Sequence, residues 1–243
     1  MKNKLNKIVS PLLILVLLFA LASCGEAKKE AGSEQKMDTY VGPVEAYAEY
    51  MMEGIKNNGS INGVHTLEYI EKQTKGVCQQ EFTALKEVVS KSDVIAPALA
   101  VHQSEADKIC KFKIIKKEAV PEEELTAAAA EISAKLDEIL DSIETFEARC
   151  QKDENLYKTA GKKVHLNEKQ TMELVADMKA VALKAKDIKF TSGYTLTVEF
   201  TYYGSEITDE FVMPAYEAKG YWVEGTVYTT IINLLTACIG AID

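Results

Sequence analysis

The chain has 243 residues, with 37 Asp and Glu against 28 Lys and Arg and a formal net charge of −9. An acidic chain repels phosphate backbones and anionic head groups, so the composition argues against a nucleic-acid partner and against a basic membrane-docking face. About 200 residues follow residue 39, which is enough for one domain with its own core, with or without a large insertion.

The first residues have the pattern of an export signal. Lys2, Lys4 and Lys7 form a positive start, and an apolar run extends from Ile8 to Ala22 and includes Pro11. A helix needs about 20 apolar residues to cross a bilayer, and this run is shorter, at about 15. The pattern therefore predicts a signal peptide over residues 1–23.

The apolar run ends in Leu21-Ala22-Ser23-Cys24, which resembles the lipobox of bacterial lipoproteins. The resemblance implies cleavage before Cys24, a diacylglyceryl thioether on its sulfur and acylation of the new amino group. The additional chain strengthens the anchor, because a single acyl chain binds a membrane only marginally and reversibly. An ordinary cleaved signal followed by a chance cysteine is the alternative. Gly25 in place of Asp resembles the outer-membrane sorting pattern. We therefore expect a lipid anchor in the cell envelope, in the outer membrane if the host is Gram-negative.

Residues 24–39 are predicted to form a tether. They are rich in Glu, Lys, Ala, Gly and Ser and have too few apolar residues to bury a core. Loss of the signal removes three lysines, which leaves 25 basic residues against 37 acidic ones and a formal charge of −12. Residues 40–243 are then expected to form a single α+β domain.

The first half of this domain predicts three helices and a strand. Helical spacing of apolar residues defines a helix from Pro43 to the Asn57-Asn58-Gly59 stop, a short helix through Leu67 and Ile70 that ends at Lys75-Gly76, and a third helix from Val77 to Ser90. Between Ile109 and Ile115, apolar residues alternate with Lys111 and Lys113, which indicates a strand.

Residues 121–186 predict an inserted hairpin of two helices. Pro121 and the carboxylates at 122–124 begin a helix that is expected to reach about Thr159, and Asn167 is a good N-cap for its partner. The first helix carries a stripe with a/d spacing, which comprises Ala129, Ile132, Leu136, Ile139, Ile143, Phe146 and Cys150. The second carries Met172, Val175, Met178 and Ala182. Such stripes are usually packing faces and in some proteins dock a separate chain.

The remainder of the chain predicts an antiparallel meander. Apolar residues alternate with polar ones from Leu196 to Tyr202, Gly204-Ser205 suits a tight hairpin turn, and a returning strand carries Ile207, Phe211 and Met213. A further turn near Lys219-Gly220 precedes a last strand from Tyr221 to Gly225.

The segments from Val44 to Gly59, Lys108 to Lys116, Tyr194 to Gly204 and Lys219 to Val223 resemble exported lipoproteins of the nuclear transport factor 2-like, or cystatin-like, cone superfamily. The resemblance covers about 110 residues and leaves 121–186 as an insertion. It implies an α+β fold in which N-terminal helices pack on a curved, cone-like antiparallel sheet and leave a small conical pocket.

The remaining residues give few chemical signals. Cys78, Cys110, Cys150 and Cys238 could form disulfides in three ways or remain buried thiols, and their spacing fits no metal motif. His102 and Glu105 could form an acid–base pair or an exposed pair at a helix start. Aromatic residues with polar tips either line a ligand pocket or pack on the sheet; they are Tyr202, Tyr203, Tyr216, Tyr221, Trp222 and Tyr228.

The sequence therefore favours a lipid-anchored envelope protein that binds a small ligand or an envelope protein, with no catalytic residues, metal or cofactor. The alternative is a cone-fold enzyme that uses an acid–base pair in the pocket, which would require a His or Asp that faces inward beside an orienting group.

Overall fold

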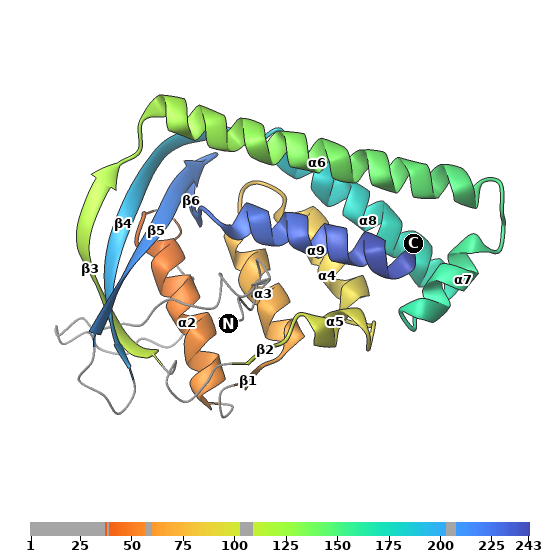
Figure 1. The fold of residues 1–243 in the computed structure, drawn as a ribbon, viewed down its shortest axis with the longest axis horizontal. Coiled ribbons are helices and arrows are strands. Elements are labelled where there is room, and N and C mark those ends of the chain that lie inside the picture. The colour runs from red at the N-terminus through yellow and green to blue at the C-terminus, as the bar shows by residue number, and fades with distance from the viewer. Residues whose placement is uncertain (1–36, 38, 57–59, 103–108, 203–207) are drawn as a thin grey trace, which may run out of the picture.

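Eight helices and a four-stranded antiparallel sheet occupy the described residues, 37, 39–56, 60–102, 109–202 and 208–243, in a computed structural model of the chain (Figure 1). In chain order the elements are α2 (Gly42–Lys56), β1 (Ser60–Ile61), α3 (Gly63–Gln73), α4 (Gln79–Val89), α5 (Ile95–Ala98), β2 (Val101–His102), β3 (Ile109–Ala119), α6 (Glu122–Cys150), α7 (Leu156–Lys163), α8 (Glu168–Lys186), β4 (Phe190–Tyr202), β5 (Thr208–Ala218), β6 (Tyr221–Glu224) and α9 (Val227–Ile242). The predicted α+β class, with N-terminal helices on a curved sheet and an inserted helical segment, is confirmed.

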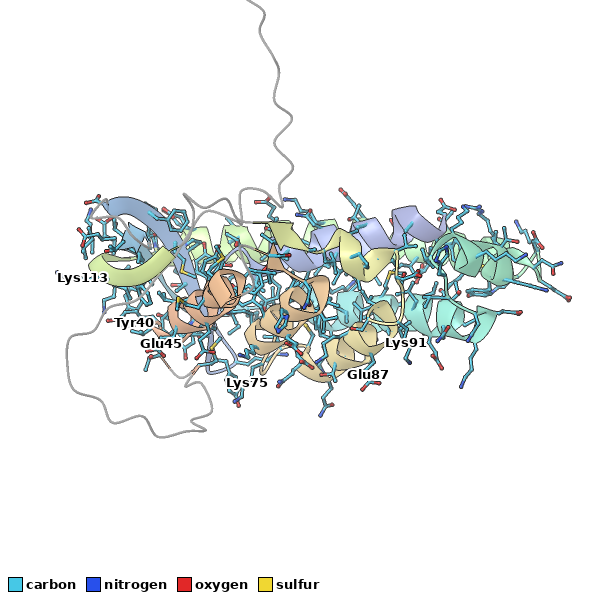
Figure 2. The ribbon with its side chains drawn as sticks, turned by 90° about the horizontal axis from the view of Figure 1, so that it is seen from below. Tyr40, Glu45, Lys75, Glu87, Lys91 and Lys113 are labelled. Carbon is cyan, nitrogen blue, oxygen red and sulfur yellow. The ribbon has the colours of Figure 1, made fainter. Side chains whose placement is uncertain are left out.

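The sheet has the order β3-β4-β5-β6 and is open, so β3 and β6 are its edges. Leu196 and Met213 are buried and paired in register, and they define what we call the inner face, against which α2 lies (Figure 1). The opposite, outer face carries Val212, which is 55% exposed, and the exposed Lys113 (Figure 2). The predicted turn at Gly204-Ser205 and the strand residue Ile207 lie outside the described residues.

The α6 stripe is a packing face. Every predicted member from Ile132 to Cys150 is buried, and Ala129 is partly buried against the core. The expected extension of this helix to Thr159 is wrong, because α6 ends at Cys150 and α7 is a separate helix. The Asp153 carboxylate accepts a hydrogen bond from the Asn155 backbone N–H at 3.0 Å. This bond forms a turn between the two helices, and α7 begins directly after it. The insertion therefore has three helices instead of two.

The predicted N-cap of α8 is confirmed. Asn167 accepts a hydrogen bond from the Gln170 backbone N–H, and the Gln170 side chain accepts one from the Asn167 N–H, each at 2.9 Å, which completes a capping box. Met172 does not belong to the buried stripe, because it is 49% exposed. The buried face of α8 instead includes Leu174 and Val181, since this helix packs against both α6 and α4.

Helix α9 was not predicted. It is apolar over most of its circumference, with Ile231, Leu235 and Cys238 among its fully buried residues, and it contacts α3, α5, α6 and α7. A helix that is buried on most sides shows little polar alternation, so the sequence carries a weak periodic signal there. Among the described helices, none is both long and apolar enough to span a membrane.

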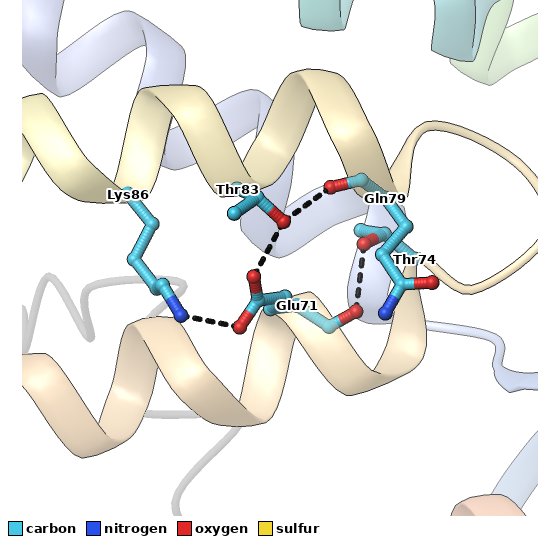
Figure 3. Close-up of polar contacts among 5 residues, drawn as sticks. All are labelled: Glu71, Thr74, Gln79, Thr83 and Lys86. Carbon is cyan, nitrogen blue, oxygen red and sulfur yellow. Dashed lines mark hydrogen bonds and ion pairs between the residues drawn. The ribbon is translucent and has the colours of Figure 1, made fainter.

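A partly buried polar network joins α3 to α4 (Figure 3). Glu71 forms an ion pair with Lys86, and its other carboxylate oxygen lies 2.6 Å from the Thr83 hydroxyl. Thr83 Oγ1 is also 2.8 Å from the Gln79 carbonyl oxygen, and Thr74 Oγ1 donates to the Glu71 carbonyl oxygen at 2.8 Å. These bonds hold α3 and α4 together.

Candidate functional site

Three aromatic rings gather on the inner face, close to the point where the chain enters the domain. Tyr40 lies 5.2 Å from Tyr194 and 6.1 Å from Trp222, and its ring stands at 65° and 75° to theirs. Tyr194 and Trp222 stack with centroids 5.4 Å apart and an angle of 10°. We call these three residues the aromatic cluster. The two stacked rings and the ring of Tyr40 form the two walls of a corner.

The corner holds a cation that belongs to the chain itself. The Nζ atom of Lys117 lies 4.3 Å from the centroid of Tyr40 and 4.4 Å from that of Tyr194. Both distances fall within the range of about 6 Å over which an aromatic face attracts a cation. Lys117 itself is exposed, whereas both tyrosines are partly buried. Both rings are therefore partly accessible to solvent, and an exposed lysine lies over them.

A β-bulge brings Lys117 to the inner face. Ile114 pairs with Val198, but Lys116 pairs with Thr197, so one extra residue interrupts the alternation of β3. As a result Lys117 pairs with Leu196 on the inner face, and Lys116 points outward, where it forms an ion pair with Glu118 at 3.0 Å. Simple alternation would place Lys117 on the outer face.

The residues before α2 are held at the same place. The Trp222 backbone N–H donates a hydrogen bond to the Met37 carbonyl oxygen at 2.8 Å, and Met37 is buried. Because β6 is an edge strand, this bond uses a backbone donor that the sheet leaves open. The end of the predicted tether thus meets the domain beside the aromatic cluster.

A buried carboxyl group lies two residues farther along β6. Glu224 is 5% exposed, and its two oxygens accept hydrogen bonds from the Thr226 N–H at 3.0 Å and the Thr226 hydroxyl at 2.6 Å. Its own backbone N–H donates to Gln73 Oε1 at 3.0 Å. Burial raises the pKa of Glu224 from 4.5 to about 7, although the bonds from Thr226 lower it. This carboxyl group can therefore change its charge near neutral pH.

Buried tyrosines from α2 and α3 surround this carboxyl group. Burial raises the pKa of Tyr47 and Tyr69 well above 10, and the negative charge of Glu224 adds to both shifts. Tyr50 stacks on Tyr69 with centroids 4.6 Å apart, and its hydroxyl lies 3.1 Å from Thr66 Oγ1. The tyrosines therefore stay neutral. The Glu224 carboxyl group is buried close to them.

A groove of about 720 Å³ runs between the start of α6 and the junction of α8 with β4. The groove is lined by Leu125, Thr126, Ala129, Ala130, Ser133 and residues 186–190. Lys186 at its rim is already paired with Asp137 at 2.7 Å. Its lining mixes apolar, small polar and charged side chains and favours no particular ligand.

The aromatic residues predicted for a pocket lie in several places. Trp222 belongs to the aromatic cluster, whereas Tyr216 and Tyr228 pack around Phe190, with centroids 4.7 and 5.9 Å away. Tyr221 lies beneath the ammonium group of Lys75 at 5.7 Å. The side chains of Tyr202 and Tyr203 lie outside the described part of the structure. Trp222 thus lies apart from Tyr216, Tyr221 and Tyr228.

The described cysteines are free and buried. Burial raises the pKa of Cys78 and of Cys238 to about 12, so both thiols are protonated and unreactive; Cys150 is also free. Cys24 and the side chain of Cys110 lie outside the described residues.

The two histidine side chains that the structure describes come from different parts of the chain. His165 Nδ1 lies 2.6 Å from the Asp93 carboxylate in an exposed contact, and His65 lies partly buried on α3. The side chain of His102 and the whole of Glu105 lie outside the described residues. Within the described residues, no group of three or more His, Cys, Asp or Glu side chains could hold a metal ion.

Sequence reasoning missed Tyr40, Lys117, Tyr194 and Glu224 as candidate site residues. The alternation of β4 does place Tyr194 on the side of Leu196, but the bulge in β3 and the approach of the chain before α2 have no simple signal. No family model, curated protein or solved structure matches the chain. Its function therefore has to be argued from the geometry of its own residues.

Proposed function

We propose that the protein is a lipid-anchored lipoprotein of a bacterial cell envelope whose domain binds a ligand at the aromatic cluster. The anchor rests on Leu21-Ala22-Ser23-Cys24 behind a signal-like start. The observation that carries the binding role is the corner of partly exposed rings that already holds an ammonium group. Aromatic faces of this kind add attraction for a cation to the burial of apolar surface.

The position of the corner supports a role near the membrane. Met37, at the end of the predicted tether, is bonded to Trp222. A lipid on Cys24 would keep this side of the domain within reach of the membrane surface, where head groups and envelope molecules are concentrated. The acidic domain would also favour cationic ligands over anionic ones.

The anchor is tested by metabolic labelling with an alkyne fatty acid. Cys24→Ala should abolish labelling and either release the protein or strand it with its signal peptide uncleaved, while Cys150→Ala, which removes a buried thiol of the domain, should leave labelling intact. Continued labelling of the Cys24→Ala protein would refute the lipoprotein assignment.

The binding role is tested by native mass spectrometry of the mature protein purified from its own envelope. A retained small molecule should be lost in Tyr194→Leu and kept in Tyr216→Leu, which alters a partly buried tyrosine of the neighbouring strand on the outer face. If both variants retained it equally, the aromatic cluster would not be the binding surface.

A second candidate is a cone-fold enzyme in which Glu224 is the acid or base. The pKa of about 7 at Glu224 favours this role, because a general acid–base residue works best when its pKa lies near the ambient pH. Against it, both carboxylate oxygens are already bonded to Thr226. Glu224→Gln should abolish any turnover found in a substrate screen, and an activity that survives the substitution would exclude this mechanism.

A further inference from the structure

We propose that the aromatic cluster is a binding site for a quaternary ammonium group and that Lys117 is its resident competitor. The inference rests on the proposed function, since it names the ligand class of the same surface. It adds that the site is closed in the free protein by a side chain of the chain itself.

The geometry of the corner fits a cation with a round, apolar surface. Tyr40 stands at 65° to Tyr194, so the faces of the two rings turn toward one shared point, which Lys117 Nζ occupies at 4.3 and 4.4 Å. Trp222 stacks behind Tyr194 and is 9% exposed, so it supports the second wall. Recognition of quaternary ammonium groups by aromatic faces uses the same attraction.

Lys117 is a poor permanent occupant of this corner. A primary ammonium group is strongly hydrated and has three hydrogens to donate, and aromatic faces replace those hydrogen bonds weakly. Among the described residues no carboxylate pairs with Lys117, whereas its neighbour Lys116 has Glu118. A quaternary ammonium group has no N–H to satisfy and loses less hydration in the corner, so it should displace the lysine.

The surroundings favour a positive ligand. Glu217 pairs in register with Trp222, so its partly buried side chain lies beside the indole on the inner face. This carboxylate adds to the attraction of an acidic domain for a cation, and it is not paired with Lys117 in the described structure.

The chain contains one tryptophan, so its fluorescence reports directly on the cluster. We would titrate the mature chain from Cys24 onward, in detergent, with choline, and with the neutral isostere 3,3-dimethylbutan-1-ol as control ligand. Choline should change Trp222 fluorescence in a saturable way, and the neutral isostere should bind at least about tenfold more weakly. Equal binding of the two compounds would overturn the proposal, because it would show an apolar pocket instead of a cation site.

The competitor is tested by Lys117→Gln. Removal of an exposed cation–π contact of about 0.5 to 1 kcal/mol should lower the Kd for choline about two- to fivefold. Lys113→Gln makes the same charge change on the outer face of the same strand and should leave the Kd unchanged (Figure 2). An unchanged or higher Kd in Lys117→Gln would refute the role of Lys117.

The walls are tested by Tyr40→Leu. Tyr40 is partly exposed and precedes α2, so the substitution should spare the fold, which the thermal midpoint by circular dichroism would verify. Choline binding should fall by at least tenfold. Retained affinity in a folded Tyr40→Leu protein would contradict the site.

Two sources could supply the ligand, a free quaternary amine or a lipid head group. Vesicles of phosphatidylcholine and of phosphatidylglycerol, mixed with the unacylated chain that carries Cys24→Ala and lacks residues 1–23, distinguish them. Binding to free choline and to phosphatidylcholine alone supports a head group, and binding to choline without either vesicle supports a soluble ligand. Saturable choline binding by a protein that is not acylated at Cys24 would refute the lipid anchor and support the ammonium site. A retained ligand that choline cannot displace would refute the ammonium site and leave the proposed binding role standing.

Discussion

At the scale of single residues, burial makes the stability contribution of Glu224 depend on pH. Its pKa rises from 4.5 in the unfolded chain to about 7 in the fold because it is buried. Between these two values the folded state binds more protons than the unfolded state, so stability falls as pH rises through this window. A shift of this size corresponds to about 3 kcal/mol, all of it lost above pH 7.

Glu224→Gln should therefore stabilise the protein at pH 8 by about 1 to 3 kcal/mol and have little effect at pH 5. Without a charge, Gln can still accept the Thr226 N–H through Oε1, and its Nε2–H can donate to the Thr226 hydroxyl oxygen, which reverses that bond. Urea denaturation at several pH values measures the difference between the two proteins. Glu217→Gln on the neighbouring strand is the control, and a constant difference between wild type and Glu224→Gln from pH 5 to 8 would contradict the prediction.

Substitutions at two glycines with positive φ distinguish the effect of backbone strain from that of steric contact. A Cβ on Gly76, where φ is +76°, would lie 2.1 Å from the Tyr221 ring, whereas one on Gly220, where φ is +82°, would meet nothing within 4 Å. Gly220→Ala should cost about 1 kcal/mol from strain alone, and Gly76→Ala should cost about 2 kcal/mol or more. Equal losses in urea denaturation would mean that the turn before α4 moves away from Tyr221.

At the scale of elements, two asparagines that each precede a helix differ in whether their side chains cap it. Asn167 is bonded to the Gln170 N–H within a capping box, whereas Asn155, which precedes α7, makes no capping bond with its side chain. Asn167→Ala should destabilise the protein by about 1 kcal/mol, and Asn155→Ala by much less. Thermal unfolding followed by circular dichroism measures both. A larger loss in Asn155→Ala would show that the start of α7 is more important than this geometry implies.

The sequence predicts elements whose signal is local. The α6 stripe and the Asn167 cap depend on neighbours within one or two turns, so both are found correctly. The end of α6 and the exposure of Met172 depend on which helices pack against the insertion, and these predictions fail. Helix α9 fails for a related reason, because burial by four other helices removes the polar face that a periodicity search needs.

The candidate site depends still more on long-range structure. Tyr40, Lys117, Tyr194 and Trp222 come from four separate segments, and the bulge at Ile114 decides the face on which Lys117 lies. Alternation alone assigns Lys117 to the outer face together with Lys113. A site built in this way can be found only after strand register is known.

At the scale of the whole molecule, α9 joins the insertion to the rest of the domain. It contacts α6 and α7 of the insertion and α3 and α5 of the N-terminal part. Leu235 is fully buried in this helix. The insertion is thus not an appendage to the sheet, because its packing surface continues into the core that α9 shares with the N-terminal helices.

Leu235→Ala should destabilise the protein by about 2 to 5 kcal/mol, and the exposed Thr229→Ala on the same helix by less than about 0.5 kcal/mol. If α9 couples the two parts, Trp222 fluorescence, which reports on the sheet, and far-UV circular dichroism, which reports mainly on the helices, should unfold together in wild type and in both variants. Trp222 is well suited as the sheet probe, since it is the sole tryptophan and lies on β6. Two separated transitions in the wild-type protein would show that the insertion and the sheet are independent units, and α9 would then belong to one of them alone.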